Sequence, residues 1–405
     1  MTAVTFVTIA ALLTARCDSP GGAEGNSAPP SAATEDPPRA DTGFVSESAG
    51  AHVALARAFA ARWTGRELRQ VPKYLQLVGW RSRDTLVALA GENPVEIDVR
   101  TSAFVAWNRP ATGAQLAPDG RRLAWADRGS YWVAERGRPP RLVLPYGRVK
   151  APGDPSGAIH WSPDGRRIAT WWLDEAAVTN VVIDLARDTA WTFETGLPRH
   201  MGGSTAFWLD TTRLLLGVTV WRAKSGADEY KESGHRGELA VCDLSAGGCR
   251  LVTDVADGVF LRPVARWGPR GILVSEHRQG QRTSRFVQRA SRFVVYDIDT
   301  WEPRPISLPV GPAVAVAPDA SLAVAAAPRV RTAPPDVTPN DTTVLVLWEA
   351  SSNASRPLAR VLGGEGQLSW SPAGDRLAIL SAEVVAALPP EGYRRRWRLT
   401  VLERR

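Results

Sequence analysis

A hairpin pattern, in which two short apolar runs flank a tight polar turn, recurs along this chain. The clearest copies cover 115–125, 159–169 and 368–378. In the second copy the turn is Ser162-Pro163-Asp164-Gly165. Proline holds φ at about −65°, glycine accepts a positive φ, and Ser and Asp side chains can hydrogen-bond the backbone of the turn. Each copy therefore predicts two antiparallel strands, and the Asp residues are explained as turn residues.

Four weaker copies keep the apolar frame and lose part of the turn. They cover 77–88, 207–216, 266–274 and 314–324, which makes seven copies. We align all seven on one strand position, residues 80, 116, 161, 208, 267, 316 and 370, and call it the Trp position because Trp161, Trp208, Trp267 and Trp370 share it. Successive copies are 36 to 59 residues apart. These intervals bracket the roughly 40 to 50 residues of a four-stranded propeller blade, and the large aromatic rings suit packing between blades.

A second pair of strands follows each hairpin. Its first member is β-branched and apolar, as in 180–185, 239–244, 293–298 and 343–348, and a further strand follows, as in 141–144 or 190–193. The pattern predicts an all-β fold, a seven-bladed β-propeller of four-stranded antiparallel blades over 65–405. The last repeat supplies only three strands, ending at 398–402. We expect 65–71 to add the missing outer strand and so to close the ring.

The turn Trp161-Ser162-Pro163-Asp164-Gly165 and strands such as 293–298 (Phe-Val-Val-Tyr-Asp-Ile) resemble those of the TolB-like and WD-repeat-like propellers of bacteria. The resemblance covers about 66–405 and implies the fold. It does not imply one function, because propellers host many unrelated activities.

The first 64 residues have a different composition. An apolar run at 4–13 precedes Cys17, and a stretch rich in Pro, Ser, Ala and Gly follows. This order resembles a bacterial lipoprotein, which implies a signal peptide over 1–16, a lipid anchor on Cys17 and a disordered tether over 17–48. Apolar residues at helical spacing predict a short N-terminal helix over 49–64. The alternative is an unprocessed cytoplasmic chain with a disordered N-terminus.

Charge and composition change this picture little. The 405 residues are 44% hydrophobic and 22% charged, as in an ordinary globular protein. The net charge of +7 comes almost entirely from Arg, and Asp and Glu are interspersed along the chain. Because no basic stripe forms, we expect no nucleic-acid partner. We expect a monomer that contacts the membrane through its lipid anchor alone.

Two cysteines, Cys242 and Cys249, flank a six-residue segment that suits a hairpin turn. Directly opposed residues in a hairpin come close enough for a disulfide, and oxidation would fit an exported protein. Two buried free thiols are the alternative.

The sequence contains no nucleophile elbow, zinc-ligand spacing, phosphate loop or paired-histidine motif. We therefore predict no catalytic residue, metal or cofactor from motifs. Residues just before the Trp position should line the central channel, and among them we select Gln115, His160 and Arg266 as candidate ligand contacts. The alternative, which is the commoner case for such residues, is an ordinary polar side chain that faces the channel.

Long polar insertions at 223–237, 279–290 and 329–341 are either tolerated loops or sites of partner recognition. Within the second, Arg282, Arg285 and Arg289 are the candidates for contact with an acidic partner.

These observations suggest two alternative functions. The first is a membrane-tethered extracytoplasmic module that binds an envelope protein or a peptide. The second is a propeller hydrolase, lactonase-like or polysaccharide-cleaving, that uses carboxylates around the channel and a divalent cation.

Overall fold

The computed structural model describes residues 44–45, 53–56, 59, 61–68, 74–107, 111–149, 154–155, 158–173, 178–193, 195–197, 200–201, 206–221, 235–278, 289–309, 311, 313–326, 342–362, 364–385 and 394–405. These residues belong to one compact unit, Thr42–Arg405. The predicted signal peptide, Cys17, Arg282 and Arg285 lie outside the described residues, and so do most of the three insertions. Of Arg289 the structure describes the backbone alone. No helix in the described part of the chain has the length and apolar character of a membrane span.

The described strands pair into antiparallel groups of four, which we call blades. Blade 1 contains β4 (Leu75–Trp80), β5 (Thr85–Ala90), β6 (Asn93–Asp98) and β7 (Phe104–Ala106). Blade 2 contains β8 (Gln115–Leu116), β9 (Arg122–Asp127), β10 (Ser130–Glu135) and β11 (Arg141–Leu144). Blade 3 contains β13 (His160–Trp161), β14 (Arg167–Leu173), β15 (Val178–Asp184) and β16 (Thr189–Phe193), with β12 (Asp154–Pro155) also paired to β14.

Blades 4 and 5 share one sheet because a single parallel pair, Gly237 with Phe260, joins β20 to β22. Blade 4 contains β18 (Ala206–Trp208), β19 (Arg213–Trp221), β20 (His235–Asp243) and β21 (Gly248–Leu251), with β17 (His200–Met201) also paired to β19. Blade 5 contains β22 (Val259–Trp267), β23 (Gly271–Arg278), β24 (Arg289–Asp297) and β25 (Pro303–Pro305).

Blades 6 and 7 draw strands from both ends of the unit. Blade 6 contains β26 (Val314–Val316), β27 (Leu322–Ala326), β28 (Thr342–Glu349) and β29 (Ala354–Leu362), and β2 (Val53–Ala56) and β1 (Phe44–Val45) extend it beyond β29. Blade 7 contains β30 (Gly364–Trp370), β31 (Arg376–Val385) and β32 (Arg394–Arg404), and β3 (Trp63–Glu67) pairs with β32 as its outer strand. The two ends of the unit thus meet in one blade, as expected, although the closing strand is 63–67 and not 65–71.

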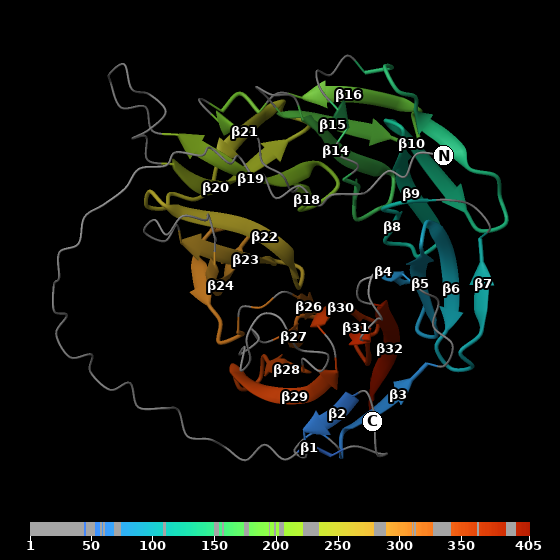
Figure 1. Ribbon diagram of the computed structural model, residues 1–405. Coiled ribbons are helices and arrows are strands. Elements are labelled where there is room, and N and C mark those ends of the chain that lie inside the picture. The colour runs from blue at the N-terminus through green and yellow to red at the C-terminus, as the bar shows by residue number, and fades with distance from the viewer. Residues whose placement is uncertain are drawn as a thin grey trace, which may run out of the picture. The chain divides into compact units, whose positions relative to one another are not determined.

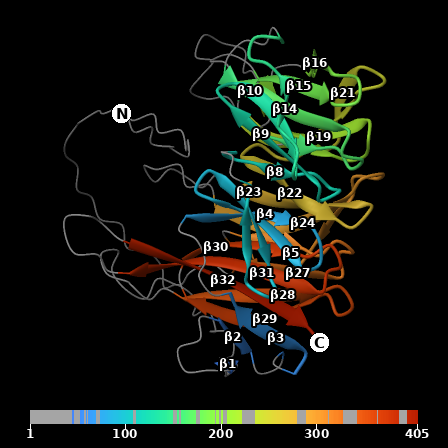
Figure 2. The same cartoon turned by 90° about the vertical axis from the view of Figure 1, so that its right-hand side faces the viewer.

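The blades follow one another around a common centre, and their first strands lie nearest to it (Figure 1). Neighbouring first strands touch, as β4 with β8, β13 with β18, β22 with β26 and β30 with β4. This is a β-propeller. Figure 2 shows the blades from the side. We call the rim at which the first strands begin the insertion rim, because segments 222–234, 279–288 and 327–341 leave and re-enter the described strands there. The opposite rim, with the turns at 117–121, 162–166 and 371–375, is the turn rim.

The turns form as the sequence predicts. Ser162 donates from Oγ to Asp164 Oδ1 over 2.7 Å and accepts from the backbone N–H of Arg167 over 2.9 Å. In the equivalent turn of blade 2, Gly120 has φ 69°, and a Cβ there would lie 2.5 Å from the backbone oxygen of Arg81 in blade 1. Only glycine satisfies both the positive φ and this close approach.

The recurring tryptophans join neighbouring blades by one repeated hydrogen bond. The indole Nε1 donates to the backbone oxygen of the residue just before the Trp position in the preceding blade. The pairs are Trp80 to Ser369 (2.9 Å), Trp161 to Gln115 (3.1 Å), Trp208 to His160 (2.8 Å) and Trp370 to Ala315 (3.2 Å). The first of these crosses from blade 1 to blade 7. The repeat therefore encodes contacts between blades as well as each hairpin.

The predicted helix over 49–64 is wrong. Strands β2 and β3 stand there, with a turn in which the N–H groups of Arg62 and Trp63 donate to the backbone oxygen of Phe59. Leu55, Phe59 and Trp63 have helical spacing, but they enter one apolar core with residues of blades 6 and 7. The free edge of β29 supplies hydrogen-bond partners to β2, and an unpaired strand edge favours such an addition. Phe44 and Val45, which fall inside the predicted tether, form β1 and pair with β2.

Cys242 and Cys249 are directly opposed in the β20–β21 pair, with Cα atoms 3.9 Å apart, and a disulfide joins them. Cys242 is buried between blades 3 and 4. The bond ties the outermost strand of blade 4 to β20.

Candidate functional site

A cavity of about 420 Å³ lies between the first strands of blades 1, 5, 6 and 7. It is lined by Leu77 and Val78 of β4, Val264 of β22, Ala313 and Val314 at β26, and Gly366, Gln367, Leu368 and Ser369 of β30. Its volume lies in the range of about 300 to 1,000 Å³ that is typical of ligand pockets.

The lining follows from the register of the repeat. Leu77, Ala313 and Gln367 stand three residues before the Trp position of their blades, and so does Val264. In β30 the pairing from Gln367 to Trp370 is regular, whereas β-bulges interrupt it between Leu77 and Gly79 in β4 and between Pro263 and Ala265 in β22. The first strands begin at the insertion rim, so the cavity lies in the half of the channel nearer that rim.

The chemistry of the wall is apolar with a few neutral polar groups. Gln367 accepts through Oε1 from the backbone N–H of Leu77 over 2.6 Å, which links blades 7 and 1 across the channel wall. Among the described lining residues there is no Asp, Glu, His, Lys or Arg. These residues can bind an apolar group and orient it by hydrogen bonds.

The three predicted ligand contacts lie elsewhere. Gln115 is exposed on β8, and its backbone oxygen accepts from Trp161. His160 is partly buried on β13, with its ring centroid 6.3 Å from that of Phe207 in blade 4. Arg266 donates from Nη2 to the backbone oxygen of Pro269 over 2.9 Å. No hydrogen bond, ion pair or ring contact among the described residues joins the three side chains, and none of them lines the cavity.

Sequence reasoning missed the cavity because it took the position one residue before the Trp position. The position three residues before it would have identified Leu77, Val264, Ala313 and Gln367. The strand period gave no such signal, because β-bulges interrupt it there in β4 and β22, and the depth of the cavity along the channel depends on the arrangement of the blades.

The His160 ring is a buried titratable group of the channel layer. Burial lowers its pKa to about 4, and Nε2 has no hydrogen-bond partner among the described residues. In the unfolded chain the pKa is 6.5, so protonation favours the unfolded state. The stability that neutral His160 provides is present above pH 6.5 and is lost as the pH falls towards 4.

We therefore expect that the free energy of unfolding depends less on pH below pH 7 in His160→Gln than in the wild-type protein. Between pH 7 and pH 5 the wild-type protein should lose about 2 kcal/mol more of its free energy of unfolding than the variant does. Urea unfolding at both pH values measures this difference. Identical losses in the two proteins would contradict the assignment.

The insertion rim also carries exposed aromatic side chains. Among the described residues, Tyr74 is 72% exposed and Tyr146 is 64% exposed. Tyr74 directly precedes β4, and Tyr146 follows the end of β11. Their backbones are held, since the Tyr74 oxygen accepts from Gly91 N–H (3.1 Å) and the Tyr146 N–H donates to Ser130 Oγ (3.0 Å). Exposed tyrosines on a rigid backbone are typical of protein-binding surfaces.

A buried carboxylate stands at the same rim between blades 4 and 5. Glu238 accepts from Thr253 Oγ1 (2.5 Å) and Val255 N–H (3.0 Å) and pairs with Arg236 (2.6 Å). Burial raises the pKa of Glu238, while these hydrogen bonds and the Arg236 charge act in the opposite direction. Its partners hold the connection from β21 to β22 in place, so we assign Glu238 a structural role.

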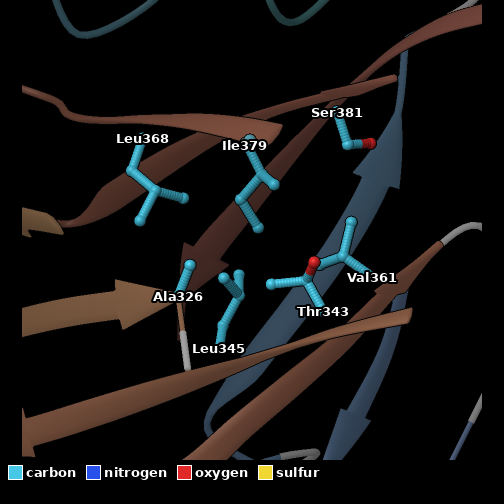
Figure 3. Close-up of a pocket in the computed structure, with 8 residues that line it drawn as sticks. Ala326, Thr343, Leu345, Val361, Leu368, Ile379 and Ser381 are labelled. Atoms are coloured by element: carbon cyan, nitrogen blue, oxygen red, sulfur yellow. The ribbon is translucent and has the colours of Figure 1, made fainter. Parts of the chain in front are cut away.

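A much smaller cavity, of about 10 Å³, lies between blades 6 and 7 (Figure 3). Leu345 and Val361 of blade 6 face Leu368 and Ile379 of blade 7 across it, with the hydroxyls of Thr343 and Ser381 at its edge. This volume is close to that of one water probe, so the cavity is a packing gap and not a ligand site. Within the described ranges, no group of three or more His, Cys, Asp or Glu side chains is arranged to hold a metal ion.

Comparison with known proteins finds solved structures of similar fold. No protein-family model and no curated protein matches the chain. An oligogalacturonate lyase in complex with manganese is similar at TM-score 0.57 and 13% identity, over 90% of this chain and 96% of that one. An oligogalacturonate lyase from Vibrio parahaemolyticus is similar at TM-score 0.56 and 10% identity, over 84% and 97%. TolB from Acinetobacter baumannii is similar at TM-score 0.38 and 14% identity, over 84% and 80%. The predicted all-β propeller is confirmed as a fold by the arrangement of its sheets, and at these identities the likeness to the two lyases extends to nothing beyond the fold.

Proposed function

We propose that this propeller is an extracytoplasmic binding module, tethered to a membrane through Cys17, that takes a protein or peptide at its insertion rim. The observation that carries the proposal is the 420 Å³ cavity beneath that rim, whose described lining residues are apolar or neutral polar. A cavity of this kind fits an apolar side chain of a partner, with Gln367 and Ser369 able to contact its backbone.

The rim above the cavity supports the same function. Tyr74 and Tyr146 offer large amphipathic surfaces there, and the three insertions leave the described strands at the same rim. Arg282, Arg285 and Arg289 belong to the second insertion and stay candidates for contact with an acidic partner.

The alternative hydrolase has less support. It would need carboxylates around the channel, and none is among the lining residues that the structure describes. One similar lyase is in complex with manganese, but at 13% identity the likeness concerns the fold alone and brings no metal to this chain.

Partner capture tests the proposal. The full-length protein is cross-linked in its native host, the captured partner is identified, and its affinity is then measured for Tyr74→Ala, Tyr146→Ala and Ala313→Phe, the last of which fills the cavity. We expect each to weaken binding by about tenfold or more. Val105→Ala, at an exposed apolar position on the outermost strand of blade 1, is the matched control and should change affinity less than about twofold. Undiminished binding by all three rim and cavity variants would refute the insertion rim as the binding face.

The anchor is tested separately by labelled fatty-acid incorporation. Wild-type protein should be labelled and Cys17→Ala should not. Equal labelling of both proteins, or of neither, would rule out Cys17 as the acceptor.

A further inference from the structure

A second cleft, of about 350 Å³, lies on the seam where the ring closes. Its walls come from both ends of the unit and from blade 1: Thr64, Gly65 and Arg66 of β3, Val99 and Arg100 after β6, Arg376 of β31, and Val401 and Glu403 of β32. Most of these residues lie towards the turn rim. The cleft is thus distinct from the channel cavity and from the proposed partner-binding face.

The charges in this cleft are unbalanced. Three guanidinium groups line it against the single carboxylate of Glu403, which accepts from Arg376 Nη2 over 2.9 Å. Arg66 donates from Nη1 to the backbone oxygen of Arg100 over 2.6 Å, so the two residues are held together across the seam. Neither Arg66 nor Arg100 forms an ion pair within 4.0 Å with a described residue. The hydrogen bond from the backbone of Thr101 and, among the smaller causes, the charge of Arg100 lower the pKa of the neighbouring Asp98. The nearby carboxylate of Asp98 accepts through Oδ1 from the backbone N–H groups of Arg100 and Thr101, both over 2.8 Å.

A buried donor in the wall adds to this imbalance. Arg376 is only 9% exposed, and its two terminal nitrogens bond to Asp84, to the backbone oxygen of Arg83 and to Glu403. Its Nε has no hydrogen-bond partner among the described residues. A buried N–H without an acceptor is unfavourable, so the electrostatics of this wall are incompletely satisfied, and an anionic group in the cleft would balance the charges of Arg66 and Arg100.

We propose that this seam cleft binds a small oxyanion, a phosphate or carboxylate group, between the guanidinium groups of Arg66 and Arg100. Guanidinium groups suit both anions because their N–H groups match paired oxygens. An anion held there bridges β3 to the connection after β6. It therefore fastens the N-terminal closing strand to blade 1 and should stabilise the closed ring.

The test is calorimetric titration of the full-length protein with inorganic phosphate and, in a separate arm, with acetate, at an ionic strength fixed with NaCl. Thermal melting is followed in parallel. We expect saturable binding of at least one probe, a rise in the melting temperature, and a loss of affinity of about tenfold or more in Arg66→Gln and Arg100→Gln. The preferred probe identifies the anion class.

Arg187→Gln is the matched control, because Arg187 is an exposed arginine without an ion pair to a described residue on the equivalent turn of blade 3, where its N–H donates to Asp184 Oδ1. It should bind the probe like the wild type. Arg66 and Arg100 are both exposed, so their variants should fold, which melting without anion verifies. Absence of saturable binding by both probes, or an equal loss in Arg187→Gln, would overturn the proposal. If either seam variant fails to fold, the wild type and Arg187→Gln still decide the outcome through the anion-dependent rise in melting temperature.

Discussion

Replacing Trp370 with alanine should lower the free energy of unfolding by about 4 kcal/mol, the cost typical of removing a large buried aromatic side chain. Trp370 is buried between blades 6 and 7, and its ring centroid lies 6.0 Å from that of Trp63 in an edge-on contact. Trp63 belongs to the closing strand β3. The substitution therefore opens a cavity at the point where a repeated hydrogen bond between blades and the closure of the ring coincide. Urea unfolding of the purified protein measures the loss.

Two further variants separate packing from hydrogen bonding at this position. Trp370→Phe keeps most of the apolar contact but removes the donor to the Ala315 backbone oxygen, so it should cost about 2 kcal/mol. Trp161→Ala, at the same position of blade 3, should cost less than Trp370→Ala, because Trp161 is partly exposed and Arg122 stacks on its face at 5.4 Å. If Trp370→Ala and Trp161→Ala lowered the free energy of unfolding equally, the position beside the closing strand would contribute no more to stability than the same position of blade 3.

Arg376→Ala should destabilise the protein by about 3 kcal/mol, because it removes a largely buried cation and leaves its partners unpaired. Arg376 bonds to Asp84 and to the backbone oxygen of Arg83 in blade 1 and to Glu403 at the end of β32. In blade 3, Arg167 makes the corresponding bond to the backbone oxygen of Thr211 in blade 4 over 3.0 Å. The arginine after the turn thus links one blade to the next, and at Arg376 that link closes the ring.

The control for Arg376 is Arg138→Ala. Arg138 pairs with Glu135 over 3.3 Å on the surface of blade 2, with 75% of its side chain exposed. A surface pair of this kind contributes little, so the change should stay within about 0.5 kcal/mol. Both variants are compared by urea unfolding at neutral pH. A loss in Arg376→Ala no larger than that in Arg138→Ala would show that the seam network does not hold the ring closed.

Local sequence patterns were sufficient where one blade or one contact between blades decided the structure. The turn at Ser162–Gly165 could be predicted because Pro, Asp and Gly satisfy its backbone demands within a few residues. The strand alternation around Trp161 and Trp370 identified the first strand of each blade for the same reason. The pairing of the first strand of the propeller with its last repeat could be inferred by counting strands, because the last repeat has three predicted strands and a blade needs four.

The sequence alone misled where the partner of a segment lay far away along the chain. The spacing of Leu55, Phe59 and Trp63 is compatible with a helix. In the structure, however, residues 53–56 form a strand because they pair with the edge of β29, which lies some 300 residues later in the chain. His160, Arg266 and Gln115 were chosen by position in the repeat, and they stay predicted ligand contacts outside the channel cavity. The depth of the channel cavity, and so the selection of Leu77 and Gln367, required the blades to be placed around their centre.

The sequence by itself determined the repeat: the hairpins, the four strands of each blade, the Trp position and the opposed cysteines, because each of these depends on neighbours a few residues apart or on a regular spacing. Only the tertiary structure decided the strand character of 53–56, the channel cavity and the arginine-lined seam cleft. These features consist of side chains and strand edges from opposite ends of the chain, and no local pattern records which of them will meet.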